Sequence, residues 1–403
     1  MTYEEALEYI RQCDNFAQKK GLGRVAKVLK SLSNPQNNYD VVHLVGTNGK
    51  GSTTSMTANI LQKSGLKVGK FISPYVYKFG ERISVDGVEI TPEKIVFYAN
   101  EIIKTLKNLD NMSLSEFEFI TVIAFLYYND ANCDIVCLEA GLGGEFDATN
   151  VVKSPKVSVV TKISLDHTRI LGDNLTDIAT TKCKIIKNSV CVSYPKQDEE
   201  VIAVLNKYNV IFPKIDELSI KKCDIYGSEI TYKGENYKIS LMGEHQIYNA
   251  LMVIEICMQI GNISYEDVYY GLSNTKFSGR MEIISENPLV IYDGAHNMDG
   301  ILALEQSVKN ILKDRKITLI MGMVQEKNAS KCVEIITKHC ENAYFVRLNN
   351  PRSENPLEIS KFSKCKSDVI EDAKTAFNIA KKEKSDVILI CGSLFLAENL
   401  KET

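Results

Sequence analysis

Residues 41–52 read VVHLVGTNGKGS, an apolar run that stops at a glycine-rich turn before a predicted helix. A turn in this position binds phosphate, because glycines let backbone N–H groups approach it and the helix N-terminus is partly positive. The spacing is not that of the standard P-loop, which would put glycine at Leu44 and a hydroxyl residue at Gly51. Lys50 is placed to neutralise a transferred phosphate and Ser52 to reach Mg²⁺. A plain glycine-rich turn with an exposed lysine is the alternative, and the flanking strand and helix favour the nucleotide loop.

Strand and helix signals alternate on both sides of this loop. Strands are expected at Asp40–Val45, Val68–Ile72, Asp134–Glu139 and Lys156–Ile163, and helices at 3–19, Ser52–Ser64 and 116–128. Such alternation is typical of an α/β fold with a mostly parallel sheet. In such sheets the ligand site lies beyond the carboxyl ends of the strands.

The pattern of apolar and polar residues changes after about residue 190. Short alternating runs predict a β-rich insertion up to 242, and a helix follows over 244–260. The segment TKFSGRMEIISENP, residues 275–288, is interpreted as an interdomain hinge because it is polar and contains glycine and proline. Four strands separated by helices come next, at Leu289–Tyr292, Ile317–Met321, Ala343–Arg347 and Asp386–Ile390. We therefore predict a P-loop-containing N-terminal domain over residues 1–280 with a mostly parallel sheet, and a smaller Rossmann-like α/β C-terminal domain over 281–403.

Composition excludes several classes of protein. The chain has 403 residues, too many for one ordinary core. A net charge of -3 argues against a general nucleic-acid binder. The N-terminus lacks the apolar region of a signal peptide, and no apolar run reaches the length of a membrane span, so no membrane association is expected. The eleven cysteines form no C-x-x-C pair, which favours reduced thiols in a cytoplasmic protein over a zinc site.

Polar residues follow several predicted strands. Glu139 ends the strand DIVCLE, His167 follows KVSVVTKI, and Ser73 follows the strand at 68–72. A carboxylate at the end of a strand beside the phosphate loop is where nucleotide-bound magnesium needs an oxygen ligand. From the residues alone, an exposed glutamate and a satisfied loop histidine remain open alternatives.

The second half of the chain offers weaker signals of the same kind. Asp293 opens the polar turn DGAHN after the strand LVIY, and Arg280 lies in the predicted hinge, from which it would reach a phosphate when two domains close. Lys182 lies in the helical segment DIATTKCKIIK, where a lysine is normally on a solvated face.

In this order the motifs resemble those of the folylpolyglutamate synthase/dihydrofolate synthase family, within the Mur ligase superfamily, whose phosphate loop reads G-T-x-G-K-G-[ST]. Beside GTNGKGS at 46–52, the resemblance is carried by GLGR at 21–24, NPQ at 34–36, ISP at 72–74, ERI at 81–83, EAGLGG and DATN within 139–150, LDH at 165–167, LMGEHQIYNA at 241–250, SGR at 278–280, DGAHN at 293–297 and GSLF at 392–395. It runs nearly end to end, and chance does not explain so many motifs in one order.

The resemblance implies roles for the matching residues. ATP would be bound by Asn48, Gly49, Lys50, Gly51, Ser52, Thr53, Asn249, Arg280, Asp293 and His296. Two Mg²⁺ ions would be held by Ser52, Ser73, Glu139, His167 and, once carbamylated, Lys182. Lys50, His167 and Lys182 would be catalytic, and a monovalent cation is a further candidate cofactor. Acceptor substrate is expected at Phe117 and Asp147, and glutamate near Arg352 and Ser393.

The activity implied is ATP-dependent ligation of L-glutamate to dihydropteroate, to folates such as tetrahydrofolate, or to both, through an acyl phosphate. The family also implies a monomer. This sequence departs from the family pattern at Tyr75, where a histidine is usual, and at Glu145, where an arginine is frequent. Thr181–Ile185 and the Phe277-Ser278 pair also differ from the usual residues. Two alternatives therefore stay open: a Mur-like ligase for a non-folate carboxylate, and a nucleotide-binding regulatory protein.

Overall fold

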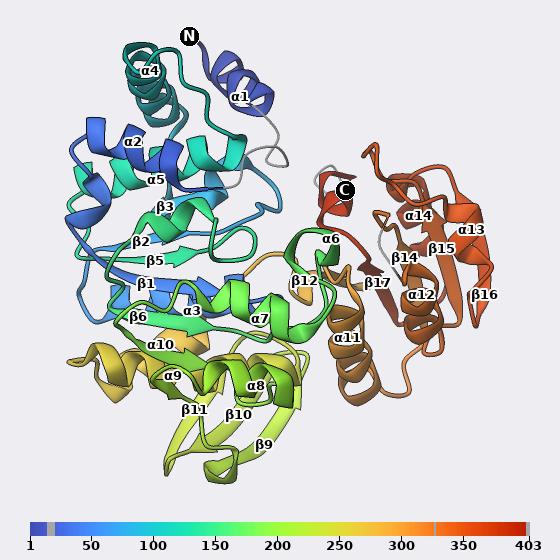
Figure 1. Ribbon diagram of the computed structural model, residues 1–403. Coiled ribbons are helices and arrows are strands. Elements are labelled where there is room, and N and C mark those ends of the chain that lie inside the picture. Colours follow the sequence, from blue (N-terminus) through green and yellow to red (C-terminus); the bar gives the residue numbers. More distant parts are fainter. Residues whose placement is uncertain (14–20, 326–327, 400–403) are drawn as a thin grey trace. The chain divides into compact units, whose positions relative to one another are not determined.

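The computed structural model describes residues 1–13, 21–325 and 328–399 (Figure 1). The chain divides into two compact units. The first comprises Met1–Asp216 and Asn249–Asn274, and the second comprises Glu217–Tyr248 and Thr275–Thr403. Each unit has its own sheet structure and its own hydrophobic core.

The first unit is built on an eight-stranded sheet in the order β4-β3-β2-β5-β1-β6-β7-β8. Its strands are β1 (Asp40–Val45), β2 (Val68–Phe71), β3 (Ile83–Val85), β4 (Val88–Glu89), β5 (Ile135–Glu139), β6 (Val157–Val160), β7 (Val190–Ser193) and β8 (Val210–Ile211). All neighbours from β2 to β8 are parallel, and only β3 runs in the opposite direction, because it is antiparallel to both β2 and β4. The prediction of a mostly parallel sheet is confirmed, and β1, which leads into the phosphate loop, lies between β5 and β6.

Helices cover both faces of this sheet (Figure 1). They are α1 (Tyr3–Gln12), α2 (Gly23–Ser31), α3 (Lys50–Lys63), α4 (Pro92–Asn108), α5 (Glu116–Asp130), α6 (Thr168–Leu171), α7 (Leu175–Cys183), α8 (Glu199–Leu205), α10 (Tyr265–Asn274) and, from Asn249 on, α9 (Glu244–Ile260). Short 3-10 turns add η2 (Pro35–Asn37), η3 (Phe79–Arg82), η4 (Ala148–Val151) and η5 (Ile215–Glu217). Because β1 is buried on both faces, it reads as a continuous apolar run broken only by His43.

Helix α3 carries the phosphate loop at its N-terminus and is itself a core element. Its residues are buried nearly all round, so the helix lacks the polar face of a surface helix. It contacts β5, β2 and α10. The packing against α10 is close, because a Cβ built on Gly271 would lie 2.3 Å from Ile60 Cγ1. This packing fixes the direction in which the helix N-terminus points.

The second unit contains two sheets. A three-stranded antiparallel sheet is formed by β9 (Leu218–Asp224), β10 (Gly227–Tyr232) and β11 (Glu235–Ile239). A six-stranded sheet has the order β12-β13-β17-β14-β15-β16, with β12 (Glu282–Glu286), β13 (Leu289–Asp293), β14 (Ile317–Met321), β15 (Asn342–Val346), β16 (Lys366–Ile370) and β17 (Val387–Cys391). Its helices are α11 (Met298–Ile311), α12 (Ala329–Thr337), α13 (Pro356–Ser360) and α14 (Ala373–Ala380), and η6 spans Leu394–Asn399. Only β12 is antiparallel to its neighbour, which confirms a second α/β region.

Several predicted elements differ from the structure. The helix expected over 3–19 ends at Gln12, and residues 14–20 lie outside the described part of the chain. The β-rich insertion expected from 190 begins only at β9, because β7 and β8 belong to the first sheet. The segment interpreted as a hinge contains β12. Across the described residues, no helix has the length and apolar character needed to span a membrane.

Candidate active site

The phosphate loop between β1 and α3 is held close to two neighbouring segments. The amides of Thr47 and Asn48 donate to the carbonyl of Lys162, at 2.8 and 3.2 Å, which ties the loop to the segment after β6. A Cβ on Gly49 would lie 2.7 Å from Asn249 Oδ1, and this glycine has φ +87°. Glycine is therefore required at position 49 both by space and by backbone conformation. Asn249, which is predicted to contact ATP, therefore lies beside the loop, and its role toward the nucleotide stays a prediction.

Lys50 is the first residue of α3, and its ammonium group folds back over the loop. Its Nζ donates to the carbonyls of Gly46 and Thr47, each at 3.2 Å. The same Nζ lies 4.0 Å from Glu139 Oε1 at the end of β5. A cation, a carboxylate and a helix N-terminus thus meet at one point, as phosphate and metal binding require.

Lys182, in the last turn of α7, is buried with only 4% of its surface exposed. Its Nζ donates to the carbonyl of Gly46 at 2.8 Å, directly behind the phosphate loop. Burial, and then the charge of Lys50, lower the pKa of Lys182 to about 7. The expectation from helical pattern alone, a solvated lysine, was wrong, because the pattern cannot show that the 140–145 loop covers this helix. A Cβ on Gly144 would lie 2.5 Å from the Lys182 carbonyl oxygen.

Three predicted metal ligands lie at or after the ends of strands of the first sheet, whereas Ser52 lies in α3 and Lys182 in α7. Glu139 is buried at the end of β5, and Ser73 follows β2, where its Oγ accepts a hydrogen bond from Arg82 Nη1 at 3.3 Å. His167 follows β6 and is the residue before α6, with φ +47°. Its side chain is 47% exposed, and its Nε2 lies 3.8 Å from Asp166 Oδ1.

The chemistry of this set suits magnesium. Ser52, Ser73 and Glu139 offer hydroxyl and carboxylate oxygens, the donors that Mg²⁺ prefers. No group of three or more His, Cys, Asp and Glu side chains able to hold a metal is found in the described ranges. The resemblance adds His167 and a carbamylated Lys182 to this set, and both stay predictions.

The two residues predicted to contact the acceptor substrate, Phe117 and Asp147, differ in burial and in their contacts. Phe117 is half-buried on α5, and a Cβ on Gly141 would lie 2.6 Å from its ring. Asp147 is only 1% exposed, and its carboxylate accepts from the amides of Leu142 and Thr149, at 2.8 and 3.0 Å, and from the Thr149 hydroxyl at 2.5 Å. Burial raises the pKa of Asp147. In this structure Asp147 organises its own loop, and its role toward substrate stays a prediction.

His43, on β1, supports the same loop, and sequence reasoning missed it. Its Nε2 shares a 2.8 Å hydrogen bond with Thr149 Oγ1. The side chain is fully buried, and burial lowers the pKa of His43 to about 3, so the ring is neutral. The one signal in the sequence is a single polar residue inside the apolar run VVHLV.

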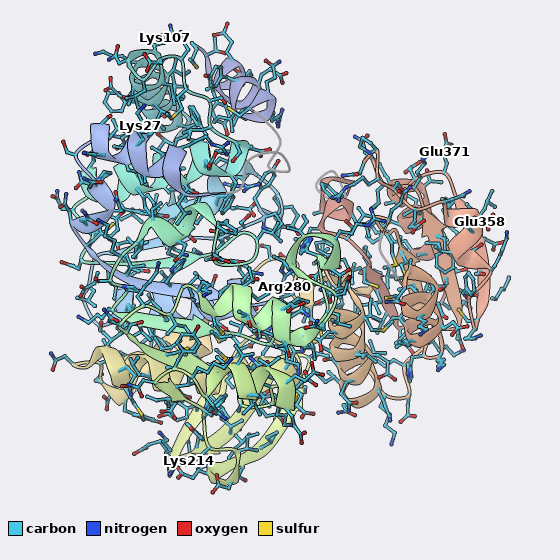
Figure 2. The ribbon with its side chains drawn as sticks, viewed as in Figure 1. Lys27, Lys107, Lys214, Arg280, Glu358 and Glu371 are labelled. Atoms are coloured by element: carbon cyan, nitrogen blue, oxygen red, sulfur yellow. The ribbon has the colours of Figure 1, made fainter. Side chains whose placement is uncertain are left out.

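Three predicted nucleotide contacts of the second unit come from two segments, one before β12 and one at the end of β13. The carboxylate of Asp293 accepts from the amides of Met281 and Ala295, both at 2.8 Å. Arg280 Nη1 donates to the Gly279 carbonyl at 2.8 Å, and its guanidinium lies 5.5 Å from the Phe277 ring centroid. Figure 2 labels Arg280 among the side chains of the chain. His296 Nδ1 lies 3.0 Å from the Gly294 carbonyl. These side chains gather where β13 ends.

The two residues expected near glutamate also belong to the second unit. Ser393 follows β17 and is buried, and its Oγ accepts from the Phe395 amide at 3.2 Å. Arg352 is exposed, and its carbonyl accepts from the Gln325 amide at 2.7 Å, so it lies beside the segment that follows β14. Because β14 and β17 are neighbours, both residues lie toward the carboxyl edge of this sheet.

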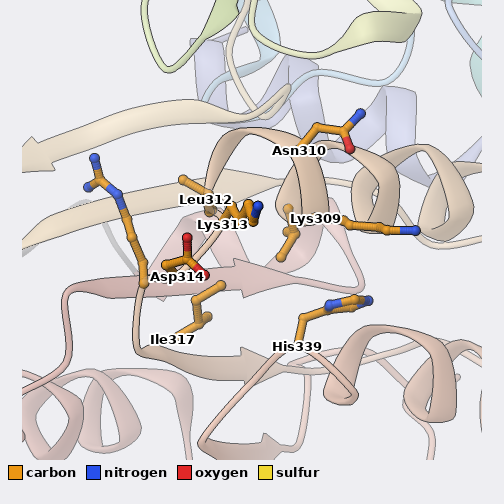
Figure 3. A pocket seen from close by; sticks show the side chains of 9 residues that line it. Lys309, Asn310, Leu312, Lys313, Asp314, Ile317 and His339 are labelled. Atoms are coloured by element: carbon orange, nitrogen blue, oxygen red, sulfur yellow. The ribbon is translucent and has the colours of Figure 1, made fainter.

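A separate cavity of about 380 Å³ lies elsewhere in the second unit, around the end of α11 (Figure 3). Its lining consists of Val308, Lys309, Asn310, Leu312, Lys313, Asp314, Arg315, Ile317 and His339. Figure 3 shows that Lys309 and His339 extend in a similar direction and do not converge on a common point with Asp314. None of the predicted site residues lines this cavity.

Comparison with known proteins identifies two domains along the chain. Residues 44–257 match the Mur ligase middle domain, and residues 279–394 match the Mur ligase glutamate ligase domain. The dihydrofolate synthase/folylpolyglutamate synthase of Bacillus subtilis is 31% identical, over 99% of this chain and 98% of that protein. The folylpolyglutamate synthase of Lacticaseibacillus casei is 30% identical, over 100% and 99%.

Solved structures agree with these sequence relatives. Mycobacterium tuberculosis folylpolyglutamate synthase, complexed with ADP and AMPPCP, superposes with a TM-score of 0.88 at 25% identity, covering 99% of this chain and 98% of that one. E. coli FolC in complex with DHPP and ADP superposes with a TM-score of 0.89 at 25% identity, covering 100% and 97%.

Proposed function

We propose, because the chain belongs to the folylpolyglutamate synthase/dihydrofolate synthase family of the Mur ligase superfamily, that its own substrates are ATP, L-glutamate and a pterin-linked carboxylate. The chain is an ATP-dependent ligase of folate metabolism. The observation that carries the proposal is the buried Lys182, held on Gly46 directly behind the phosphate loop. A protein that only senses nucleotide needs no such amine. Relatives of 30% identity over the whole chain disfavour a non-folate acceptor.

The proposed reaction has two steps, phosphorylation of the acceptor carboxylate and attack of the glutamate amine on the product. An oxygen of the acceptor carboxylate forms a bond to the γ-phosphorus of ATP, the bond from that phosphorus to the β–γ bridging oxygen breaks, and ADP leaves. The α-amine of glutamate then attacks the acyl carbon, loses a proton and displaces inorganic phosphate. Carboxylate and triphosphate repel one another, so Lys50 and the N-terminus of α3 lower the barrier of the first step by neutralising charge.

Magnesium would be held by Ser52, Ser73, Glu139, His167 and carbamylated Lys182. When bound, it supplies further positive charge to the phosphate oxygens. Two ions are proposed because the resemblance implies them, and because Ser73, Glu139 and His167 lie at or after the ends of three different strands, β2, β5 and β6. Arg280, Asp293 and His296 are proposed as nucleotide contacts of the second unit.

Carbamylation of Lys182 needs a neutral amine, which attacks CO₂ and gives up a proton. A pKa of about 7 leaves most of this amine neutral at pH 8, whereas an ordinary lysine is almost fully protonated there. We expect Lys182→Ala to lose nearly all activity and to regain part of it with added short carboxylic acids, measured as ADP release. The matched control is Lys184→Ala, two residues along the chain and exposed, which keeps full activity. Full activity of Lys182→Ala would remove Lys182 from the mechanism.

The acceptor is tested with one set of assays. Purified protein is given ATP, glutamate and either dihydropteroate or tetrahydrofolate, and both ADP and product mass are followed. A glutamylated product from dihydropteroate shows synthase activity, and a product from tetrahydrofolate shows chain extension. ADP release without a ligated product from either acceptor would contradict the proposed substrates. Cytoplasmic location, a monomeric state and a monovalent cation stay predictions.

A further inference from the structure

Arg82 is a buried cation in η3 of the first unit. It is 9% exposed, and among the described residues no carboxylate lies within 4.0 Å of its guanidinium. Its Nε is buried without a hydrogen-bond partner in the same part of the chain. Among the described residues, the one hydrogen bond of its side chain runs from Nη1 to Ser73 Oγ, at 3.3 Å. A buried guanidinium without an anion is costly, so this arrangement needs a reason.

The loop that carries Arg82 is held rigid by its neighbour. The carboxylate of Glu81 accepts from the amides of Val76, Tyr77 and Lys78, at 2.8, 2.9 and 2.8 Å. The Arg82 carbonyl accepts from the Ile72 amide at 3.0 Å. The guanidinium is therefore placed in advance and does not have to be ordered by a ligand.

Aromatic rings hold the guanidinium from the side. Its carbon lies 5.2 Å from the Tyr75 ring centroid and 5.9 Å from that of Phe79. Such contacts fix the plane of an arginine and leave its N–H groups for in-plane recognition of a carboxylate. Tyr75 stands where the family usually has histidine, so this pairing is a property of this chain.

The surroundings indicate which anion Arg82 receives. Glu116, which precedes Phe117, and Glu139, which lies 4.0 Å from Lys50, both act on Arg82 electrostatically. Arg82 is thus near both the predicted acceptor residue and the predicted metal ligands. The phosphates of ATP already have Lys50 and the N-terminus of α3.

We propose that Arg82 binds the carboxylate of the acceptor substrate, the group that is phosphorylated, and that Tyr75 holds the guanidinium in the plane for this contact. The proposal rests on the carboxylate ligation proposed above. It makes Arg82 a residue that selects acceptors with a free carboxylate and positions one carboxylate oxygen for attack on the γ-phosphorus.

The test compares dihydropteroate with its carboxamide, which has the same pterin and ring and no charge. Binding to the wild-type protein and to Arg82→Gln is measured by calorimetry, with ADP present. We expect the wild type to prefer the carboxylate by roughly 10- to 100-fold, the value of one charged hydrogen-bonded contact. Arg82→Gln is expected to bind the two compounds with affinities within about threefold of each other. The substitution weakens binding of the carboxylate and leaves binding of the carboxamide unchanged.

A control and a second variant keep the test decisive if Arg82→Gln is unstable. Arg24→Gln removes another partly buried arginine, one that already pairs with Glu118 at 2.9 Å, and it should keep the preference for carboxylate. Arg82→Lys retains the charge and should retain part of the preference, with a raised KM for the acceptor and an unchanged KM for ATP.

The outcomes separate this proposal from the function on which it rests. A preference that persists in Arg82→Gln and Arg82→Lys, or an equal loss of affinity for acid and amide, overturns the role of Arg82 alone. A wild-type protein that binds neither compound overturns the folate acceptor and the Arg82 contact together.

Discussion

Lys182 shows at the residue scale how burial changes both chemistry and stability. Its pKa is lowered from 10.5 to about 7, mainly by burial. Between these two pH values the unfolded chain binds a proton that the folded chain has released. Stability therefore rises with pH across the window from about 7 to 10.5, by at most about 1.4 kcal/mol per pH unit from this group.

Replacing Lys182 by methionine should remove this dependence. We expect Lys182→Met to be more stable than the wild type near pH 7, and the difference to shrink toward pH 10. The measurement is urea unfolding at pH 7.5 and 9.5 in buffers free of bicarbonate, with the exposed Lys184→Met as control. A constant difference between wild type and Lys182→Met at the two pH values would mean that the amine does not titrate in this window.

Lys50 provides the second test at this scale. Lys50→Ala should reduce ADP release by at least about 100-fold, because one preorganised donor to developing charge is worth this much. Little change in stability is expected, since its two bonds to the carbonyls of Gly46 and Thr47 are long, at 3.2 Å, and the Gly46 carbonyl keeps its bond from Lys182. The control is Lys156→Ala, which removes an exposed pair with Asp40 and should leave activity unchanged. Near-normal turnover of Lys50→Ala would exclude it from phosphate binding.

The sequence says more about the residue types of the candidate site than about their surroundings. Residue types and order selected Lys50 and Glu139, the family resemblance added Lys182, and the roles of all three stay predictions. The burial of Lys182 and the use of Asp147 within its own loop could not be read from sequence, because both depend on how the 140–150 loop packs. Pattern reasoning treats each segment separately, whereas burial is decided by segments distant in the chain.

At the scale of elements, helix and strand bounds were predicted correctly where an apolar pattern ends at residues that stop a helix or strand. Strands β1 and β14 and helix α9 have the predicted bounds. Two strands of the second sheet were missed. Strand β16 lies at an edge and is mostly exposed, so it has no apolar run, and β12 is half-exposed in a segment with glycine and proline. Edge strands need backbone pairing more than apolar side chains, which hides them from a sequence-based analysis.

The turn before α3 offers an element-scale test with a matched control. Gly49 and Gly65 have similar backbone conformations, with φ +87° and +92°, at opposite ends of the same helix. A Cβ on Gly49 would lie 2.7 Å from Asn249 Oδ1, whereas a Cβ on Gly65 would meet nothing within 4 Å. Both alanine variants should lose about 1–2 kcal/mol of stability through strain. Only Gly49→Ala should also lose ATP affinity, by at least about tenfold, in equilibrium binding.

Equal loss of ATP affinity in the two glycine variants would show that backbone strain at the ends of α3 controls ATP binding, and not the shape of the phosphate loop. Unchanged affinity in both would remove Gly49 from the nucleotide site. Unfolding in urea gives the stability of each variant and separates these outcomes from simple misfolding.

At the scale of the molecule, the sequence predicted two α/β regions, and the structure has them. The boundary is harder to predict, because the polar segment 275–288 has the composition of a linker. In the structure this segment is bonded into the second unit. The Met281 amide donates to Asp293 Oδ2, the Gly294 amide donates to the Gly279 carbonyl, and the Gly279 amide donates to Glu282 Oε2, each at 2.8 Å. The predicted division after residue 280 would cut through these bonds.

Insertion of a short flexible segment distinguishes the two boundaries in the intact chain. Six glycine and serine residues placed after Asn274, where the first compact unit passes into the second, should be tolerated, with a small change in thermal stability. The same insertion after Arg280 separates Gly279 from its bonds to Glu282 and Gly294, each worth about 0.5–3 kcal/mol. It should lower the unfolding temperature and ADP release together, because Arg280 and Asp293 are proposed nucleotide contacts. Full tolerance after Arg280 would instead support a boundary at 280/281.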